Sequence, residues 1–162
     1  DLDATGRGQT WSWVTPGAGL LCWDPLQTGK VSSGIQLFGS ATWWLMFEDG
    51  YAAMDALDDN RDGALTGDEL DGLSLWVDAN TDGVSDPGEV RPLARFNITQ
   101  LATRADKGAS DGGSLVCAAG VTYSSGRVSP TFDWVTRPIA KLQHDRAPQP
   151  SPAMSGVYLD KD

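Results

Sequence analysis

The sequence predicts an α+β fold with an N-terminal β-hairpin, an aromatic helix, two tandem short-linker acidic loops, a small C-terminal antiparallel sheet and an extended C-terminal arm. The 162 residues include 19 glycines and nine prolines, which indicate many turns and little helix. Short runs with period-two alternation also outnumber the one run with helical spacing. The length favours a single domain, residues 1–143, followed by the arm at 144–162.

The first part of the chain predicts a hairpin and then a helix. TWSWV (10–14) alternates as a half-buried strand does, and GLLCW (19–23) is a short apolar run, with Pro and Gly between them. The next run carries apolar residues three to four positions apart, which predicts a helix over about residues 42–57 that is capped by Ser40 or Thr42. Its stripe toward the core comprises Trp44, Phe47, Tyr51, Met54 and Leu57.

The last part of the chain predicts strands. GEVRPLARF indicates a short helix with Pro92 in its first turns, where a proline is tolerated. ITQLATRA, SLVCAAGVTY and TFDWVTRPIAKL are β-type runs between turn residues, which suit a small antiparallel sheet. From His144 onward the chain has several prolines and no periodicity, so we expect an extended arm that ends in the β-competent segment SGVYLD.

The charge is concentrated in the middle of the chain. The formal net charge is −10, and ten of the 22 acidic residues lie between Asp58 and Glu89, where Arg61 is the only base. Mutual repulsion on this scale requires a positive partner, and a cation is the simplest one. Few and scattered bases argue against nucleic acid, and no apolar run is long enough to span a membrane.

Two twelve-residue segments in this region have the ligand spacing of a calcium loop. Such a loop provides oxygen atoms from positions 1, 3, 5, 7, 9 and 12, with glycine at position 6 for the sharp turn. The sequence matches this pattern twice, with Gly63 and Gly83 at position 6. The candidate ligands of the first loop are Asp58, Asn60, Asp62, Ala64, Thr66 and Glu69, and those of the second are Asp78, Asn80, Asp82, Val84, Asp86 and Glu89.

With these two loops the chain resembles the EF-hand calcium-binding family, and its bacterial secreted tandem calcium-loop variants in particular, over about residues 43–96. The resemblance implies two bound Ca²⁺ ions. The spacing is similar to that of dockerin modules, although dockerins usually close their loops with Asp and here Glu69 and Glu89 close them. Because the second loop has four acidic ligands and the first has three, we expect the second to bind more tightly.

The sequence departs from a paired EF-hand between the loops. LDGLSLWV is too short for one helix to leave the first loop and another to enter the second, so we expect the helix begun near Gly67 to end around Gly72 or Leu73, with LSLWV extended. Position 8 is Leu65 in the first loop and Ser85 in the second, which puts strand pairing between them in doubt. The segments starting at Asp1 and Asp24 resemble the opening of these loops, and they are either degenerate copies or merely turn-forming segments.

These features favour a secreted, calcium-binding structural protein whose fold is stabilised by calcium. The arm could pair with a neighbouring subunit, so we expect self-association, as an extracellular filament or surface layer. The alternative is a carbohydrate-binding or adhesion module that uses some of the seven tryptophans. An enzyme is less well supported, because His144 is the only histidine and the usual hydrolase and phosphate-loop motifs are missing.

Three further features of the sequence bear on an extracellular location. Cys22 and Cys117 are far apart in sequence, so they are either one disulfide or two buried reduced thiols. Asn97 begins an Asn-Ile-Thr glycosylation sequon, which would make a glycoprotein in a glycosylating pathway. The chain begins at Asp1 rather than Met, which is compatible with a removed signal peptide.

Overall fold

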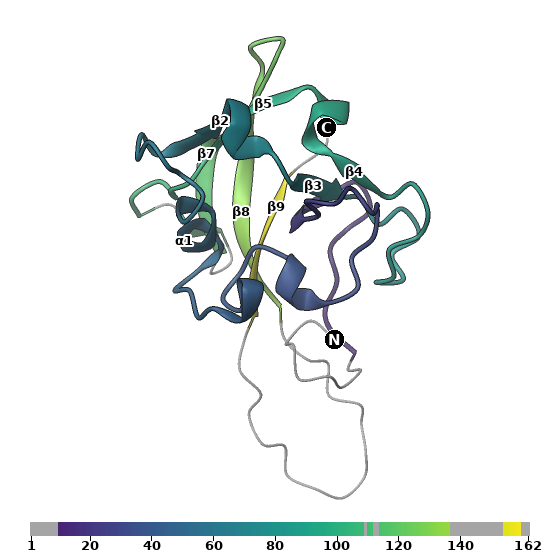
Figure 1. Ribbon diagram of the computed structural model, residues 1–162. Helices are drawn as coiled ribbons and strands as arrows, with labels where there is room; N and C mark the ends of the chain where they lie inside the picture. Colours follow the sequence, from purple (N-terminus) through teal and green to yellow (C-terminus); the bar gives the residue numbers. More distant parts are fainter. Residues whose placement is uncertain (1–9, 109, 112–113, 137–153, 160–162) are drawn as a thin grey trace, which may run out of the picture.

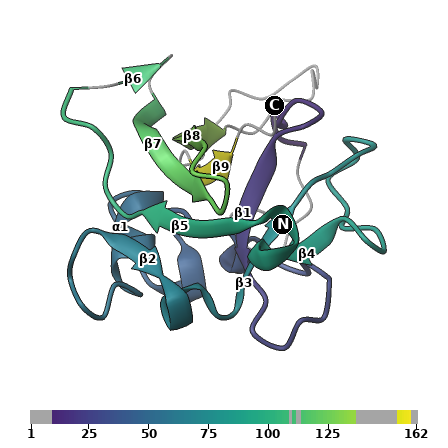
Figure 2. The ribbon, with the colours of Figure 1, turned by 90° about the horizontal axis from the view of Figure 1, so that it is seen from above.

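The computed structural model describes residues 10–108, 110–111, 114–136 and 154–159, and these form one strongly curved antiparallel sheet with short helices around it (Figures 1 and 2). The strands follow the order β2-β5-β7-β8-β9-β1-β3-β4, and β6 pairs with β7. The strands are β1 (Gly19–Trp23), β2 (Ala64–Thr66), β3 (Leu73–Trp76), β4 (Val90–Pro92), β5 (Ile98–Ala102), β6 (Ser110–Asp111), β7 (Ser114–Tyr123), β8 (Val128–Thr136) and β9 (Met154–Leu159).

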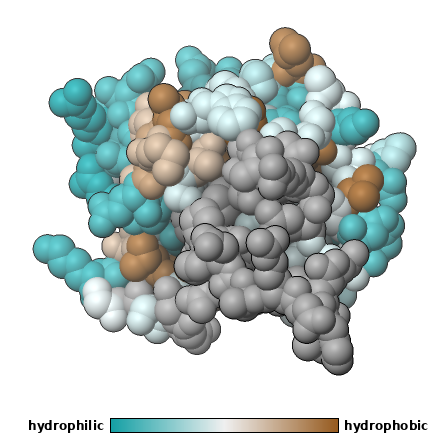
Figure 3. Space-filling model, turned by 90° about the horizontal axis from the view of Figure 1, so that it is seen from below, coloured by the Kyte–Doolittle hydropathy of each residue, from teal (hydrophilic) through white to brown (hydrophobic). Residues whose placement is uncertain are grey.

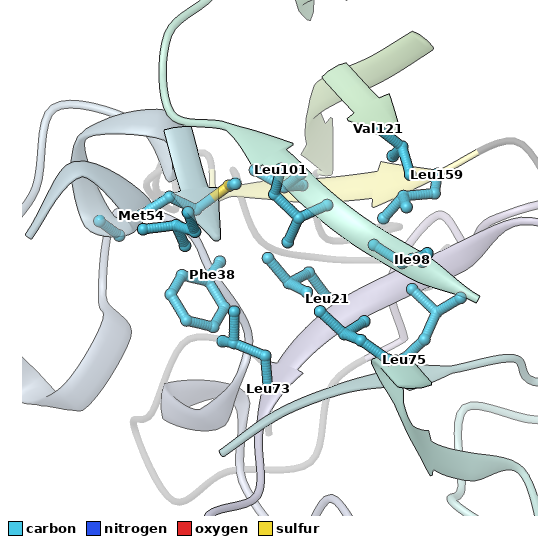
Figure 4. Close-up of a cluster of buried hydrophobic side chains, with 13 residues drawn as sticks. Leu21, Phe38, Met54, Leu73, Leu75, Ile98, Leu101, Val121 and Leu159 are labelled. Atoms are coloured by element: carbon cyan, nitrogen blue, oxygen red, sulfur yellow. The ribbon is translucent and has the colours of Figure 1, made fainter. Parts of the chain in front are cut away.

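The main core lies on the concave side of this curved sheet. Figure 4 shows side chains from β1, β3, β5, β7 and β9 directed toward a common interior, together with Phe38 and Met54. Leu21, Leu101 and Val121 are fully buried there. A second, smaller core gathers Trp76, Val90 and their neighbours beside the second acidic loop. Burial of these apolar side chains is the principal stabilising contribution to the fold.

The predicted α+β fold class is wrong, because the described residues are dominated by strands. The one α-helix among them is α1 (Gly50–Asp55), and the other helical segments are single 3₁₀ turns: η1 (Gly34–Gln36), η2 (Thr42–Trp44), η3 (Gly67–Leu70) and η4 (Leu93–Phe96). The acidic loops are therefore not flanked by helix pairs. The second loop leaves β3 and enters β4, so it is a strand-loop-strand unit.

The predicted helix over residues 42–57 is broken into two short pieces. Trp43 and Trp44 have φ values of 53° and 63°, which no α-helix accommodates. The α-helix starts only at Gly50, where the Asp49 carboxylate accepts the N–H of Ala52 at 2.8 Å as an N-cap. Trp43 and Tyr51 reach the core from these separate pieces, whereas Trp44, which the predicted helix placed in its core-facing stripe, is 67% exposed.

The predicted N-terminal hairpin and the separate C-terminal sheet are also wrong. GLLCW forms β1, but β1 pairs with β3 and β9 instead of with the run before it. The C-terminal runs do form β5, β7 and β8, and these strands belong to the same sheet as β1. The predicted short helix around Pro92 is divided between β4 and the 3₁₀ turn η4.

The end of the predicted arm is a strand inside the sheet. Residues 154–159 form β9, which pairs with β8 along six residue pairs and with β1 along two. Val157 and Leu159 are 1% and 2% exposed, so their burial fixes the register. The rest of the predicted arm, 144–153 and 160–162, lies outside the described residues.

None of the helices in the described part of the chain has the length and apolar character that a membrane crossing requires. The lower face of the molecule carries several separate hydrophobic patches among hydrophilic ones (Figure 3). Trp44, Leu45 and Met46 form a consecutive exposed apolar segment, with 67%, 55% and 86% of each residue exposed.

Candidate metal centres

The first residue of each acidic loop is a buried aspartate that organises the loop backbone. Asp58 is 6% exposed and Asp78 is 1% exposed, although the loops around them face solvent. In each case one carboxylate oxygen accepts the N–H of the position-6 glycine, Gly63 or Gly83, at 2.8 Å. These bonds curl the chain around the aspartate and hold its side chain in one orientation.

The glutamate at position 12 folds back over the start of each loop. Glu69 Oε1 accepts the N–H of Asp59 at 3.0 Å, and its Oε2 accepts the N–H of position 9 at 2.9 Å. Glu89 repeats both bonds, with Ala79 at 2.8 Å and with position 9 at 3.0 Å. Thr66 and Glu69 also form a capping box for η3, so Glu69 stabilises the start of this 3₁₀ turn as well.

The middle ligand positions are exposed and close together. In the second loop the side-chain amide of Asn80 donates to Asp82 Oδ2 at 3.0 Å and to Asp86 Oδ2 at 3.1 Å. Position 3 thus lies within hydrogen-bonding distance of both position 5 and position 9. In the first loop Asn60 Oδ1 accepts the N–H of Asp62 at 2.8 Å.

The segment at residues 24–35 has the same backbone as the two acidic loops. Asp24 is 3% exposed, and its Oδ2 accepts the N–H of Gly29, the sixth residue, at 2.8 Å. All three segments have a left-handed residue at position 4 and a left-handed glycine at position 6: Gln27 and Gly29, Arg61 and Gly63, and Thr81 and Gly83. Leu26 and Ile35 stand at positions 3 and 12, where ligands would be needed. This third loop keeps the turn and lacks the ligand set.

The second loop pairs with this third loop and not with the first. The Ser85 hydroxyl donates to the carbonyl of Val31 and accepts its N–H, both at 2.9 Å. Both residues stand at position 8 of their loops. Leu65, the position-8 residue of the first loop, pairs with Leu101 of β5. The position-8 residues of the two acidic loops therefore have different partners and do not pair with each other.

The donor set suits a hard divalent cation. The side chains at the ligand positions offer carboxylate, amide and hydroxyl oxygens, which calcium prefers, and no imidazole or thiolate, which zinc prefers. In the described residues no group of three or more Asp, Glu, His or Cys side chains is gathered closely enough to hold an ion. The carboxylates at positions 1 and 12 bond to backbone N–H groups instead. Small side-chain rotations at the exposed positions would be needed to converge on a metal.

The surroundings of the first loop provide a limited positive charge. Arg104 Nη2 lies 3.4 Å from Asp55 Oδ1, and its guanidinium lies close to Gly63 in the loop turn. Both side chains of the ion pair are largely exposed, so the pair contributes little to stability. The two bases near this loop, Arg61 and Arg104, leave most of the local negative charge uncompensated.

Hydrogen bonds stabilise the ionised form of Glu89. Desolvation acts to raise the pKa of this carboxyl group, but the N–H groups of Ala79 and Asp86 and the indole of Trp76 outweigh it and lower the pKa below its usual value. The side chain is thus held as a carboxylate over the start of the second loop, which is the state that binds a cation.

Residues 1–135 match the sequence model of a known protein family, the SPM domain. The chain belongs to the SPM domain family. The match includes both acidic loops and the third loop, so the three repeated turns lie within this SPM domain.

A curated relative of this SPM domain is the iron-regulated protein FrpA of Neisseria meningitidis serogroup C. The two sequences are 34% identical over 94 residues, which is 55% of this chain and 8% of FrpA. The chain therefore corresponds to a small part of that protein's length.

The remaining predicted residues lie apart from the loops. Cys22 of β1 and Cys117 of β7 are both buried and free, which is the second of the two states that the sequence allowed. Burial, with the nearby Asp24 as a smaller cause, raises the pKa of Cys22 to about 12, and burial raises that of Cys117 as well. Asn97 is exposed in a left-handed conformation at the end of η4.

Sequence reasoning missed the residues that surround the second loop of this SPM domain. The indole N–H of Trp13 donates to Asp78 Oδ2 at 2.6 Å, and that of Trp76 donates to Glu89 Oε2 at 3.3 Å. Ser85 was noticed only as an unusual position-8 residue. No local sequence pattern joins Trp13 to a loop 65 residues away, whereas Trp76, two residues before Asp78, could have been considered.

Proposed function

We propose that this SPM domain is a calcium-binding structural module in which the loops at 58–69 and 78–89 each bind one Ca²⁺ ion. The observation that carries the proposal is the arrangement shared by both loops: a buried, oriented aspartate at position 1 and a glutamate at position 12 folded back over it. The position-7 carbonyls of Ala64 and Val84 and the side chains at positions 3, 5 and 9 complete each ligand set.

The proposed role of the ion is to stabilise the fold. The first loop connects α1 to η3 through the edge strand β2, and the second connects β3 to β4, so both loops tie elements of the sheet together. An ion that binds only the folded state stabilises it by about 2.7 kcal/mol per site at a hundredfold excess over Kd. An extracellular location, which we also propose, would provide calcium at that level.

Thermal unfolding with calcium and with EGTA tests this role. Two filled sites should raise the Tm by roughly 10 to 20 °C for a domain of this size. Glu69→Gln and Glu89→Gln should each remove about half of that increase, measured from the variant's own Tm in EGTA. That Tm should itself be lower than the wild type's, because glutamine offers one acceptor oxygen where each glutamate offers two to backbone N–H groups. Equal melting curves in calcium and EGTA would contradict the proposal. Calorimetry of the two variants would also show whether the second loop binds more tightly.

A second candidate function is association with another molecule through the exposed segment Trp44–Leu45–Met46. Consecutive exposed apolar residues of this kind are typical of contact surfaces, for another protein or for carbohydrate. Self-association through the C-terminal segment would require a different route. Because β9 pairs with β8 and β1 of its own chain, it could join two copies only by exchange between them. Measuring the oligomeric state of the wild type and of Trp44→Ser in solution distinguishes these routes, because Trp44→Ser should abolish association through the exposed segment and leave strand exchange unaffected.

A further inference from the structure

We infer that the indole N–H groups of Trp13 and Trp76 position the two end carboxylates of the second metal site. Asp78 and Glu89 stand at positions 1 and 12 of that loop, and each accepts a hydrogen bond from one of these indoles, at 2.6 Å and 3.3 Å. The inference deepens the proposed function and rests on it. It assigns the two tryptophans as positioning residues that lie outside the ligand set.

The first loop lacks this arrangement. Within the described residues, the hydrogen bonds accepted by Asp58 and Glu69 come from backbone N–H groups of the same loop. The second loop has the same bonds from position 6 to the aspartate and from positions 2 and 9 to the glutamate, a bond from position 4 where the first loop has one from position 5, and the two indole bonds in addition. The difference between the loops is therefore external support, because their internal turns are alike.

The two indoles are fixed by packing. Trp76 is 3% exposed on β3, and its ring centroid lies 5.3 Å from that of Trp13 at an interplanar angle of 59°. Trp13 also packs edge-on against Trp134 of β8, at 6.1 Å and 80°. A donor held in this way directs its N–H without the loss of side-chain freedom that a flexible donor would incur.

The bond pattern leaves metal-binding capacity on the carboxylate. Each oxygen of an ionised carboxylate can accept about two hydrogen bonds. Asp78 Oδ2 accepts both the Gly83 N–H and the Trp13 indole, whereas Oδ1 accepts only the N–H of Thr81. Trp13 thus adds a second bond to Oδ2, restrains the rotation of the carboxylate, and leaves Oδ1 as the oxygen with more free acceptor capacity for a cation. Outer groups that orient metal ligands in this way typically contribute 10-fold to 100-fold to metal affinity.

A consequence is that the second site connects distant parts of the chain. Trp13 belongs to the segment before β1, and Trp76 ends β3, so the ion in the second loop would stabilise the docking of the segment around Trp13. By thermodynamic reciprocity, loosening of that segment would weaken metal binding by the same factor.

The test measures Ca²⁺ binding by calorimetry in the Glu69→Gln background, where only the second loop is intact. Trp13→Phe keeps an aromatic ring and removes the N–H donor, and it should weaken Ca²⁺ binding at least 10-fold. Trp76→Phe, which removes the other donor, should also weaken it. Trp134→Phe keeps an aromatic ring against Trp13 and removes neither bond to the loop, so it should weaken Ca²⁺ binding much less than Trp13→Phe does. In the Glu89→Gln background, Trp13→Phe should leave binding at the first loop unchanged.

Terbium luminescence provides a second readout that does not depend on affinity alone. Tb³⁺ in the second loop should be sensitised by excitation of the adjacent indoles, which would place the bound ion beside Trp13 and Trp76. Circular dichroism and the Tm in EGTA establish that each variant is folded, and if Trp13→Phe does not fold, Trp76→Phe provides the test. Unchanged Ca²⁺ affinity in a folded Trp13→Phe or Trp76→Phe would overturn the inference, as would an equal loss in Trp134→Phe. An absence of Ca²⁺ binding in the Glu69→Gln background itself would instead overturn the proposed function of the second loop.

Discussion

Replacement of Ser85 by alanine should destabilise the protein through one side-chain hydroxyl that joins two loops. Ser85 is 8% exposed, and its hydroxyl makes two hydrogen bonds of 2.9 Å to the backbone of Val31. These bonds stand where two paired loops would otherwise share a short backbone ladder. The substitution removes both of them and leaves the N–H and carbonyl of Val31 without this partner.

The magnitude follows from the number and burial of these bonds. A typical hydrogen bond contributes about 1 kcal/mol net, and a buried polar group left without a partner costs about 1 to 3 kcal/mol. Val31 is only partly buried, so water can replace part of the loss. We therefore expect the free energy of unfolding to fall by about 2 kcal/mol.

Urea unfolding in EGTA measures this change without any contribution from metal. Ser32→Ala is the matched control, because Ser32 follows Val31 in the third loop, is exposed, and has a hydroxyl whose bond among the described residues is to the Gln36 side chain. The control should stay within about 0.5 kcal/mol of the wild type. A Ser85→Ala protein as stable as the control would refute the conclusion that the two loops support each other through this hydroxyl.

Three further predictions concern the rest of the fold. A Cβ at Gly120 would lie 2.0 Å from Thr131 Oγ1, so Gly120→Ala should reduce the free energy of unfolding by about 3 kcal/mol in urea titration. Asp24→Ala removes a carboxylate that accepts the backbone N–H groups of Thr28 and Gly29 and the Thr28 hydroxyl. The free energy of unfolding should therefore fall by about 3 kcal/mol in the same assay, while calorimetry should still count two Ca²⁺ ions per chain. Burial raises the pKa of Cys22 to about 12, so above the ordinary thiol pKa of 9.0 the folded state keeps this proton while the unfolded state releases it. The free energy of unfolding should therefore fall between pH 9 and 12, by up to about 1.4 kcal/mol per pH unit from this group. Cys22→Ala should show a shallower fall when unfolding is measured at alkaline pH.

The acidic loops were predictable because their determinants are local. The ligand types, the glycine at position 6 and the glutamate at position 12 all lie within twelve residues, and the structure folds both segments into the same turn. The extended run before the second loop was predictable for a similar reason, since eight residues cannot hold two helices. The faint repeat at Asp24 rested on one Asp and one Thr-Gly pair, and these are the residues that shape the third loop.

The fold class was not predictable from local patterns, because it depends on pairing between distant segments. β9 lies between β8 and β1, and nothing within its six residues specifies either partner. The apolar run from Trp44 to Leu57 has helical spacing, but the chain forms the 3₁₀ turn η2 and the short helix α1 there, with left-handed residues that spacing cannot reveal. The indole of Trp13 contacts a loop 65 residues away for the same reason.

These observations explain how two loops with the residue spacing of calcium loops are closed without pairs of flanking helices. A twelve-residue ligand loop requires only that its two ends be brought together, and antiparallel strands do this as well as a helix pair does. At the second loop Trp76 pairs with Val90, and at the third Cys22 pairs with Leu37, so each loop is closed by an antiparallel bridge that begins two residues before its aspartate. β1 and β3 also pair with each other, which places these two loops on one rigid framework. The first loop, entered from α1, is instead closed by Glu69 and by the pairing of β2 with β5. The sheet therefore takes over the closing role of the flanking helices, and the resemblance to EF-hands extends to the loops and not to the fold.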